Sequence, residues 1–279
     1  MDSGDPHLQK KRIHQIAGPE RIFANRLLKV VANLPLKGIE RSIKFSPGLF
    51  LHERFLVGIA PAYWSVALFT HIYTELQMPE ALRKQFAESI KRANFLGLAF
   101  ELAERGCVYK IYLEYPVQLN RHSTDDTAEP VLQYHGFKWN PQAADQHGIT
   151  DYVWRPRLSQ TAIAAQFNHH LAHLAMPHIA ELMQHVLAQA AARADAREFV
   201  FLEVGEAGST RKSVDLNVYS AGIKLAQIHA QIAMIAANFG VQMDALLPVL
   251  ERDAAQILGH VSAGRDRNGA DFLTIYYDH

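Results

Sequence analysis

The chain of 279 residues has one cysteine, no net charge and no long apolar run, and each absence excludes a class of protein. The single Cys107 excludes an internal disulfide and a cysteine-ligated zinc cluster, and it suits a reducing compartment. The 28 basic and 28 acidic residues cancel, so no overall field attracts nucleic acid or an anionic membrane. We therefore expect no nucleic-acid or membrane partner, and any site for an anion must be local.

The start of the chain and its most apolar segment indicate where the protein is found. Residues 1–15 are polar and basic and lack the apolar core of a secretory signal. The longest nearly apolar run, residues 56–69, is shorter than the roughly 18 residues that suggest a membrane span. We predict a cytoplasmic protein with a polar lead at residues 1–18 and one domain at residues 19–279.

The sequence predicts strands in pairs, with helices between the pairs. The five pairs are expected at residues 40–46 and 49–58, 95–102 and 108–115, 131–139 and 149–155, 198–204 and 213–219, and 258–265 and 271–278. Turn residues such as Pro47-Gly48 and Asn268-Gly269 join the strands of a pair. Apolar spacing and capping residues predict helices at 19–34, 61–76, 79–92, 159–194, 220–240 and 244–257.

Five antiparallel hairpins separated by helices do not fit an ordinary parallel α/β sheet. Closure of the ten strands into a barrel removes the sheet edges, and the apolar face of each hairpin suits a surrounding helix. The predicted fold class is therefore α+β, a ten-stranded antiparallel β-barrel of five hairpins surrounded by α-helices in αββα repeats. The polar strand faces then point into the lumen. The alternative is a sheet whose polar faces lie in solvent, because alternation alone does not identify the wet side.

Two of the predicted strands carry the chemically richest faces. In the strand at 108–115, Lys110, Tyr112 and Glu114 alternate with apolar residues. In the strand at 213–219, the residues Asp215, Asn217 and Tyr219 alternate in the same way. A lumen lined by such residues is equipped to bind a polar ligand.

These features resemble those of the soluble ABBA prenyltransferases, whose barrel of ten antiparallel strands is built from repeated α-β-β-α units. Lys110-Ile-Tyr112 looks like the Lys-x-Tyr of the family's fourth strand, and Asn217-Val-Tyr219 looks like the polar-x-Tyr of its eighth. An arginine on the second strand is similar to Arg54, and the tyrosine of the last strand is similar to Tyr276. On the sixth strand, where the family repeats basic and tyrosine residues, only Arg155 carries over.

In that family an allylic diphosphate lies inside the barrel, with its phosphates held by Arg and Lys and its allyl chain enclosed by tyrosines. The resemblance implies a prenyltransferase that moves a dimethylallyl or longer group from an allylic diphosphate to an aromatic or other nucleophilic acceptor. The acceptor is expected in a small molecule or a peptide, of the Trp/Tyr type or the cationic guanidine type. The resemblance implies that no cofactor is required; magnesium is compatible with such a site but is not predicted.

Allyl transfer needs cations where the leaving charge grows, a π-rich wall for the carbocation and the exclusion of water. The residues expected to bind substrate are Lys44, Arg54, Lys110, Tyr112, Arg155, Asn217, Tyr219 and Tyr276. The carboxylates expected on inner faces are Glu101, Glu114, Glu203 and Asp215. They are candidate catalytic bases, although we expect most of them to pair with inward Lys and Arg.

Other interpretations remain open. A non-catalytic barrel that binds an amphipathic ligand uses the same lumen, and an interaction module is favoured if the polar faces lie in solvent. His169 and His173 lie one helical turn apart, but no nearby acid or cysteine completes a zinc site, so we interpret them as exposed helix residues. Gly205–Gly208 is interpreted as a hairpin turn, and Arg265 and Arg267 as residues in solvent.

Overall fold

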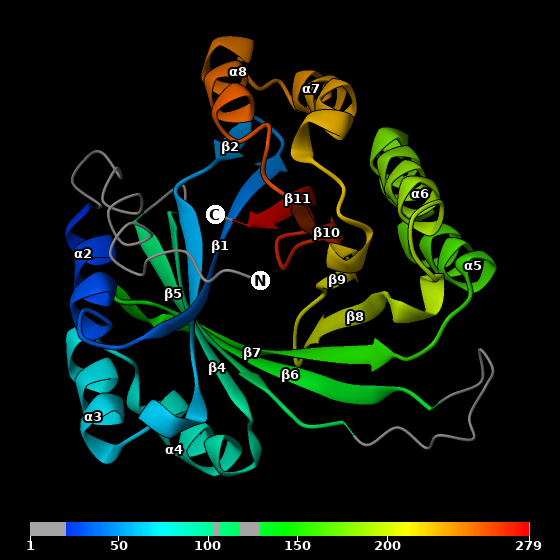
Figure 1. Cartoon of the computed structure of the whole chain (residues 1–279). Helices are drawn as coiled ribbons and strands as arrows, with labels where there is room; N and C mark the ends of the chain where they lie inside the picture. The colour runs from blue at the N-terminus through cyan, green and yellow to red at the C-terminus, as the bar shows by residue number, and fades with distance from the viewer. Residues whose placement is uncertain (1–20, 103–105, 118–128, 279) are drawn as a thin grey trace.

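The computed structural model describes residues 21–102, 106–117 and 129–278, and the predicted lead at residues 1–18 lies outside them. In this part of the chain, eleven strands form one antiparallel sheet around a central space, with the helices outside (Figure 1). The strands are β1 (Leu36–Ser46), β2 (Leu49–Leu51), β3 (Arg54–Ile59), β4 (Phe95–Leu102), β5 (Cys107–Glu114), β6 (Val131–Asn140), β7 (Ala143–Arg155), β8 (Val200–Glu206), β9 (Lys212–Asn217), β10 (Leu258–Arg265) and β11 (Asp271–Asp278).

The α-helices lie before the first hairpin and between later hairpins, and they cover the outside of the sheet (Figure 1). They are α2 (Arg21–Val30), α3 (Val66–Glu75), α4 (Glu80–Ser89), α5 (Gln160–Leu171), α6 (Pro177–Ala191), α7 (His229–Asn238) and α8 (Met243–Arg252). No helix among the described residues is both long enough and apolar enough to cross a membrane.

The sheet is a closed barrel, because its first and last strands pair. Strands β1 and β11 run antiparallel from the Glu40–Asp278 pair to the Phe45–Leu273 pair. Strands β2 and β3 both pair with β1 and are separated only by residues 52–53, so the barrel has ten strand positions. The predicted ten-stranded antiparallel barrel surrounded by helices is confirmed.

Alternation along each strand separates a helix-covered outer face from the lumen. On β1, Ile43 and Phe45 belong to the buried core, whereas Ser42 and the half-buried Lys44 occupy the opposite face. The core forms two layers outside the sheet. One joins β3–β6 to α2–α4, and the other joins β8–β11 to α5–α8. Burial of these apolar faces drives closure, since each face has one helix layer to pack against.

Three hydrogen bonds, two of them buried, attach the helical layer to the barrel. The Trp139 indole donates to the carbonyl of Leu76, which ends α3, at 2.7 Å. The Tyr109 hydroxyl donates to the carbonyl of Phe23 in α2 at 2.7 Å. On the other side, the Tyr277 hydroxyl donates to the Asp253 carboxylate at 2.7 Å. Each bond satisfies a polar atom that burial would otherwise leave without a partner.

Several elements differ from the sequence prediction. The helix predicted at 61–76 begins only at Val66, where Ser65 is the N-cap. The helix predicted at 159–194 is two helices, because Pro177 begins α6 after a non-helical Met176. The helix predicted at 220–240 begins only at His229, since Gly222 takes a left-handed conformation with φ of 58°. The segment before residue 149, predicted as a polar loop, is part of β7. It pairs with β6 through backbone hydrogen bonds, which form whether or not the side chains are apolar.

Close packing of β9 against β10 is tested by a substitution at Gly264. Its φ is +155°, and a Cβ there would lie 2.3 Å from the Lys212 carbonyl oxygen and 2.5 Å from the Ser213 Cα. We predict that Gly264→Ala lowers the free energy of unfolding in urea by roughly 1–3 kcal/mol. Gly205→Ala is the control, because a Cβ there meets nothing within 4 Å, and it should be neutral or stabilise by up to about 1 kcal/mol. Equal effects of the two substitutions would contradict this packing.

Candidate active site

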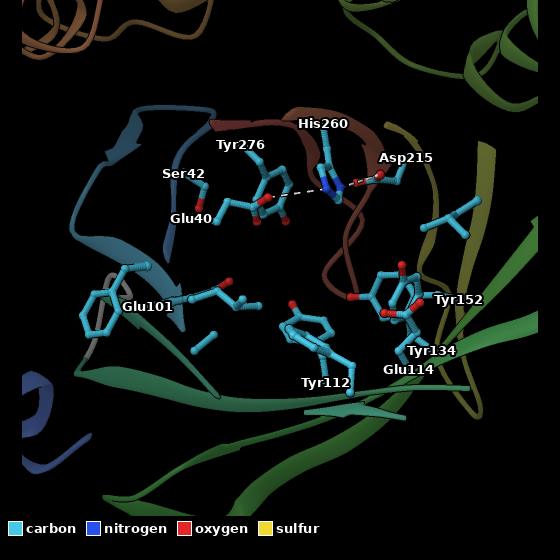
Figure 2. Close-up of a pocket in the computed structure, with 15 residues that line it drawn as sticks. Glu40, Ser42, Glu101, Tyr112, Glu114, Tyr134, Tyr152, Asp215, His260 and Tyr276 are labelled. Atoms are coloured by element: carbon cyan, nitrogen blue, oxygen red, sulfur yellow. Dashed lines mark hydrogen bonds and ion pairs between the residues drawn. The ribbon is translucent and has the colours of Figure 1, made fainter. Parts of the chain in front are cut away.

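The barrel encloses a cavity of about 220 Å³, and the side chains that line it point inward from nearly every strand (Figure 2). The lining residues are Glu40, Ser42, Phe55, Leu56, Phe95, Ala99, Glu101, Tyr112, Glu114, Tyr134, Tyr152, Leu202, Asp215, His260 and Tyr276. The set combines aromatic rings, carboxylates and one imidazole around one cavity inside the barrel.

The strand directions divide the lumen into two ends of opposite charge. On β1 the inward residues run from Glu40 to Lys44, and on β5 they run from Lys110 to Glu114. Because β1 and β5 point in opposite directions, the two lysines lie at one end of the barrel and the two glutamates at the other. We call these the cation end and the acid end.

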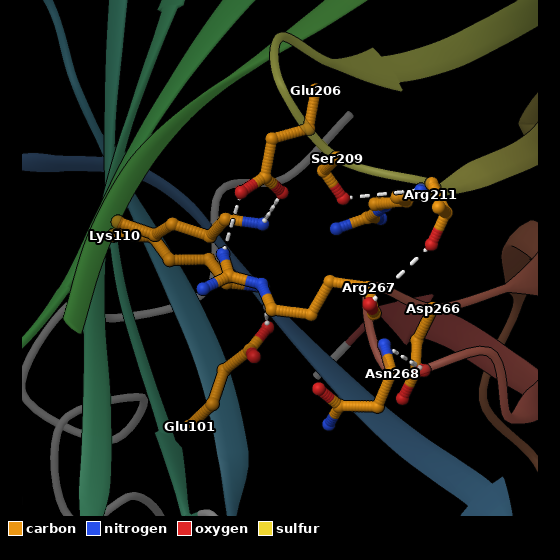
Figure 3. A network of polar contacts seen from close by, with 10 residues as sticks. Glu101, Lys110, Glu206, Ser209, Arg211, Asp266, Arg267 and Asn268 are labelled. Atoms are coloured by element: carbon orange, nitrogen blue, oxygen red, sulfur yellow. Dashed lines mark hydrogen bonds and ion pairs between the residues drawn. The ribbon is translucent and has the colours of Figure 1, made fainter.

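The cation end collects positive side chains from separate strands and loops. Its cations are Lys44, Arg54, Lys110, Lys138, Arg211 and Arg267, and its carboxylates are Glu101, Glu206 and Asp266. The Glu101 Oε1 atom accepts hydrogen bonds from Lys110 Nζ at 2.5 Å and from Arg54 at 2.8 Å. The Glu206 carboxylate pairs with Lys138 and, at 2.8 Å, with Arg267 (Figure 3). Six cations against three carboxylates leave an excess of positive charge.

Burial lowers the pKa values of the lysines at this end, and the neighbouring cations lower them further. Burial, followed by repulsion from Arg54, lowers the pKa of Lys44 to about 8. Burial, partly offset by Glu101, lowers the pKa of Lys110 to about 7. Burial opposes ionisation of Glu101, but attraction by Arg54 and Lys110 outweighs it and lowers the pKa of this carboxyl to about 2. An additional anion at this end would restore the full charge of the lysines.

Several buried donors near the cation end have no partner. Arg211 Nε, Thr150 Oγ1 and Ser213 Oγ are buried without a hydrogen bond to any described residue. A buried group left unsatisfied costs about 1–3 kcal/mol. The Lys44 ammonium and the Arg211 guanidinium both lie over the Phe272 ring, at 5.0 and 5.8 Å from its centre. The end is therefore rich in donors and short of acceptors, which is the arrangement that binds a multiply charged anion.

Tyrosine rings form the wall between the two ends. The Tyr112 and Tyr152 rings lie 5.7 Å apart, and Tyr134 follows at 6.2 Å from Tyr152. Tyr276 packs against His260 on the opposite wall, at 5.4 Å. Burial raises the pKa of Tyr112 and Tyr276 well above the usual range, so these hydroxyls stay neutral. The middle of the lumen is a neutral, electron-rich surface.

The acid end is organised around His260. Its Nδ1 lies 3.1 Å from Asp215 Oδ1, and its Nε2 lies 3.4 Å from Glu40 Oε2. The Asn217 amide lies 3.1 Å from Nε2, and the Tyr219 hydroxyl donates to Glu40 at 2.9 Å. Burial disfavours the imidazolium, but the two carboxylates outweigh burial and raise the pKa of His260 to about 9. His260 is therefore protonated at neutral pH.

Glu114 completes the acid end and has a different environment. Its Oε1 accepts a hydrogen bond from the Gln133 side-chain amide at 3.2 Å. It forms no ion pair with any described residue, and burial raises the pKa of its carboxyl. Tyr134 lies directly opposite it on β6.

The structure places most of the predicted site residues around the lumen. Lys44, Arg54, Lys110 and Glu101 meet at the cation end, and Tyr112 and Tyr276 are in the wall. Glu114, Asp215, Asn217 and Tyr219 lie at the acid end. Asn217 and Tyr219, which the sequence predicts to bind substrate, therefore lie at the end of the barrel opposite Lys44, Arg54 and Lys110. Tyr219 also follows the end of β9 and lies in a 3₁₀ turn, Tyr219–Ala221.

The predicted inner positions of Glu203 and Arg155 are wrong. Arg155 Nε lies 2.5 Å from Glu203 Oε1, and His170 of α5 lies 3.1 Å from the same oxygen, so the group is on the outer face. Leu202 lines the cavity in place of Glu203. The inner face of β8 is apolar at this point, and Glu203 lies on the outer face, which is turned toward α5.

Several residues of the site were missed. Tyr134, Gly136 and Lys138 alternate on the inner face of β6, but the neighbouring Gln133 and His135 make both faces polar and hide the signal. Tyr152 and Glu40 went unassigned as well. His260 and Ser262 are alternate polar residues on β10, and this alternation indicates that both face the lumen. Arg211 directly precedes β9, outside the residues that alternate along the strand. Arg267, expected in solvent, pairs with Glu206 at the cation end.

The described residues contain no group of three or more side chains arranged to hold a metal ion. His169 therefore does not belong to a metal-binding cluster within this part of the chain.

No known family model and no curated protein matches the sequence, whereas solved structures match nearly its whole length. One is 6-dimethylallyltryptophan synthase from Micromonospora olivasterospora in complex with DMASPP and Trp, with TM-score 0.61, 11% identity and coverage of 97% of this chain and 94% of that one. Another is AnaPT from Neosartorya fischeri, with TM-score 0.59, 10% identity and coverage of 98% and 91%. NotF in complex with brevianamide F and DMSPP gives TM-score 0.56, 11% identity and coverage of 95% and 90%. The chain thus has the barrel fold of the ABBA prenyltransferases.

The charge state of His260 provides a test of the acid end. We predict that its imidazole titrates with a pKa near 9, because Glu40 and Asp215 stabilise the charged form. The measurement is a pH titration of the histidine side-chain signals by NMR, with the signal assigned by its loss in His260→Gln. The raised pKa means that this stabilisation of the fold is full below pH 6.5 and is lost as the pH rises through about 9. A titration near pH 6.5 would contradict the ion-paired arrangement.

Proposed function

We propose that the protein is a prenyltransferase that moves an allyl group from an allylic diphosphate to an aromatic or other nucleophilic acceptor. The observation that carries the proposal is the convergence of six cations at one end of the barrel, next to a cavity lined by tyrosines and reached through Glu101. A barrel that binds only a neutral amphipathic ligand gives no reason to bury such an excess of charge. The solved proteins with this fold named above include complexes with DMASPP and DMSPP, which supports a prenyl diphosphate as donor.

The donor's diphosphate would lie at the cation end. When the C–O bond to the allyl group breaks, its electron pair leaves with the diphosphate, and Arg54, Lys110 and the other cations stabilise the growing charge. Burial lowers the pKa values of Lys44 and Lys110, and a bound anion would favour their protonated forms. In this proposal the chain's own cations neutralise the leaving group, and no cofactor is assigned.

The allyl group would lie against the tyrosine wall. The faces of Tyr112, Tyr152 and Tyr276 offer π density to the carbocation, and a desolvated cation over one ring gains about 2 kcal/mol. The closed barrel also limits water, which would otherwise capture the cation. The rings therefore both stabilise and protect the reactive group.

The acceptor would approach from the acid end. Its nucleophilic atom forms a bond to the allyl carbon, and the proton that it loses passes to one of the carboxylates there, Glu40, Glu114 or Asp215. Tryptophan and brevianamide F in the complexes with this fold support an aromatic acceptor, in a small molecule or a peptide. The single cysteine supports a reducing compartment, and we place the reaction in the cytoplasm.

Donor binding is the first test of the proposal. We predict that dimethylallyl S-thiolodiphosphate, a non-hydrolysable donor, stabilises the protein by ~2.7 kcal/mol at 100 times its Kd. Lys110→Met should weaken its binding roughly 10- to 100-fold, because a hydrogen bond to a charged group contributes about 1.5–3 kcal/mol. Lys84→Met, on the exposed face of α4, is the control and should bind like the parent. Absence of binding, or the same affinity in Lys110→Met, would contradict the assignment of the donor's diphosphate to the cation end.

Turnover is the second test. We predict that incubation with dimethylallyl diphosphate and a panel of indoles, tyrosine derivatives and arginine- or tryptophan-containing peptides adds one C5H8 unit to an acceptor, detected by mass spectrometry. Lys110→Met should form much less product, whereas Lys84→Met should match the parent. Tight donor binding without any product from the whole panel would favour a barrel that binds but does not catalyse.

A further inference from the structure

The acid end of the lumen carries more negative charge than its own cations neutralise. Four carboxylates line the cavity, but its lining includes no lysine and no arginine. One of them, Glu101, is paired with Arg54 and Lys110 at the cation end. The others, Glu40, Glu114 and Asp215, face a single imidazolium, His260. The cavity wall thus supplies three carboxyl groups and a single imidazolium, so it has fewer cationic groups than acidic ones.

Glu114 is the cavity-lining carboxylate that lacks a cation. Glu40 and Asp215 share His260, whereas the hydrogen-bond partner of Glu114 is the neutral amide of Gln133. Lys37 attracts Glu114 electrostatically, but its side chain is exposed and makes no ion pair with that carboxylate. Burying an unpaired charge is costly, so the arrangement is stabilised when a ligand supplies the missing cation.

Aromatic rings stand beside this carboxylate. Tyr134 is paired with Glu114 across β5 and β6, and its ring meets Tyr152 edge-on at 6.2 Å. A cation next to Glu114 would therefore contact both a carboxylate and ring faces, which together bind a positive charge more strongly than either alone. A neutral indole would use the rings but would leave the carboxylates without a partner.

We propose that the acceptor carries a cationic nitrogen group, a guanidinium or an ammonium, which lies between Glu114 and the Glu40–His260–Asp215 group. The inference rests on the proposed function, because the donor's diphosphate takes the opposite, cation end of the same lumen. The lumen then matches two substrates of opposite charge, each at the end that lacks its counter-charge. Complementary charge of this kind also fixes the direction in which the acceptor enters.

The test compares cationic probes with a neutral probe of the same shape. The protein, saturated with dimethylallyl S-thiolodiphosphate, is titrated in a calorimeter with N-acetyl-arginine N-methylamide and with its neutral citrulline counterpart. The lysine counterpart is the third probe, and its affinity relative to arginine distinguishes an ammonium site from a guanidinium site. We expect a cationic probe to bind about 30-fold more tightly than the citrulline probe. This ratio corresponds to the lower part of the range of coupling energies for desolvated charge pairs.

Variants then locate the preference. Glu114→Gln keeps the shape and removes the charge, so it should reduce the preference for the cationic probe several-fold. Glu203→Gln makes the same exchange on the outer wall of the barrel and should retain the preference in full. The affinities of the cationic and neutral probes are compared on the unmodified protein. The inference can therefore be tested even if the Glu114→Gln protein does not fold.

Three results would overturn the inference: equal affinity for the cationic and neutral probes, no binding of any probe, or an unchanged preference in Glu114→Gln. The affinity for the donor analogue is measured in the same samples and tests the proposed function separately. Donor binding without a preference for cationic probes would overturn the cationic acceptor and leave prenyl transfer standing. Failure to bind the donor would overturn the proposed function itself.

Discussion

The site depends on the pairing of β1 with β11, which closes the sheet. The register from Glu40–Asp278 to Phe45–Leu273 turns a row of hairpins into a barrel with an inside. Without closure, the inner side chains of β1, β5 and β10 would lie on a solvated surface, and their charges would be screened. Closure removes them from water and brings Lys44 near Arg211, and Glu40 near His260.

Charge separation follows from the same geometry. In an antiparallel barrel, adjacent strands run in opposite directions, and so do β1 and β5, which are three steps apart. A cation late in β1 and another early in β5 therefore lie at the same end of the barrel. Glu101 and Glu206 hold part of the cationic cluster in place without neutralising all of it. The opposite end has the reverse imbalance around His260. The neutral tyrosine wall separates the two charged ends, and its apolar ring faces can contact a reactive apolar group.

Much of this could be predicted from alternation and turn residues. The hairpin count, the barrel and the inward positions of Lys110, Tyr112 and Asp215 follow from the period of two along each strand. The errors have physical causes. On β8 the apolar neighbours of Glu203, Leu202 and Val204, face the lumen, and Glu203 faces outward. The position of the charged residue therefore does not identify the inner face of this strand. His260 gains its significance only from Glu40 and Asp215, which distant strands bring to it, and no local pattern contains that information.

The central claim is that the two ends of the lumen divide donor from acceptor. A crystal structure of the protein with dimethylallyl S-thiolodiphosphate tests it most directly. The account predicts both phosphate groups within hydrogen-bonding distance of Arg54, Lys110 and Arg211, with the alkyl chain against Tyr112 and the acid end left free. Phosphate groups bound beside His260, or an analogue bound outside the barrel, would contradict it.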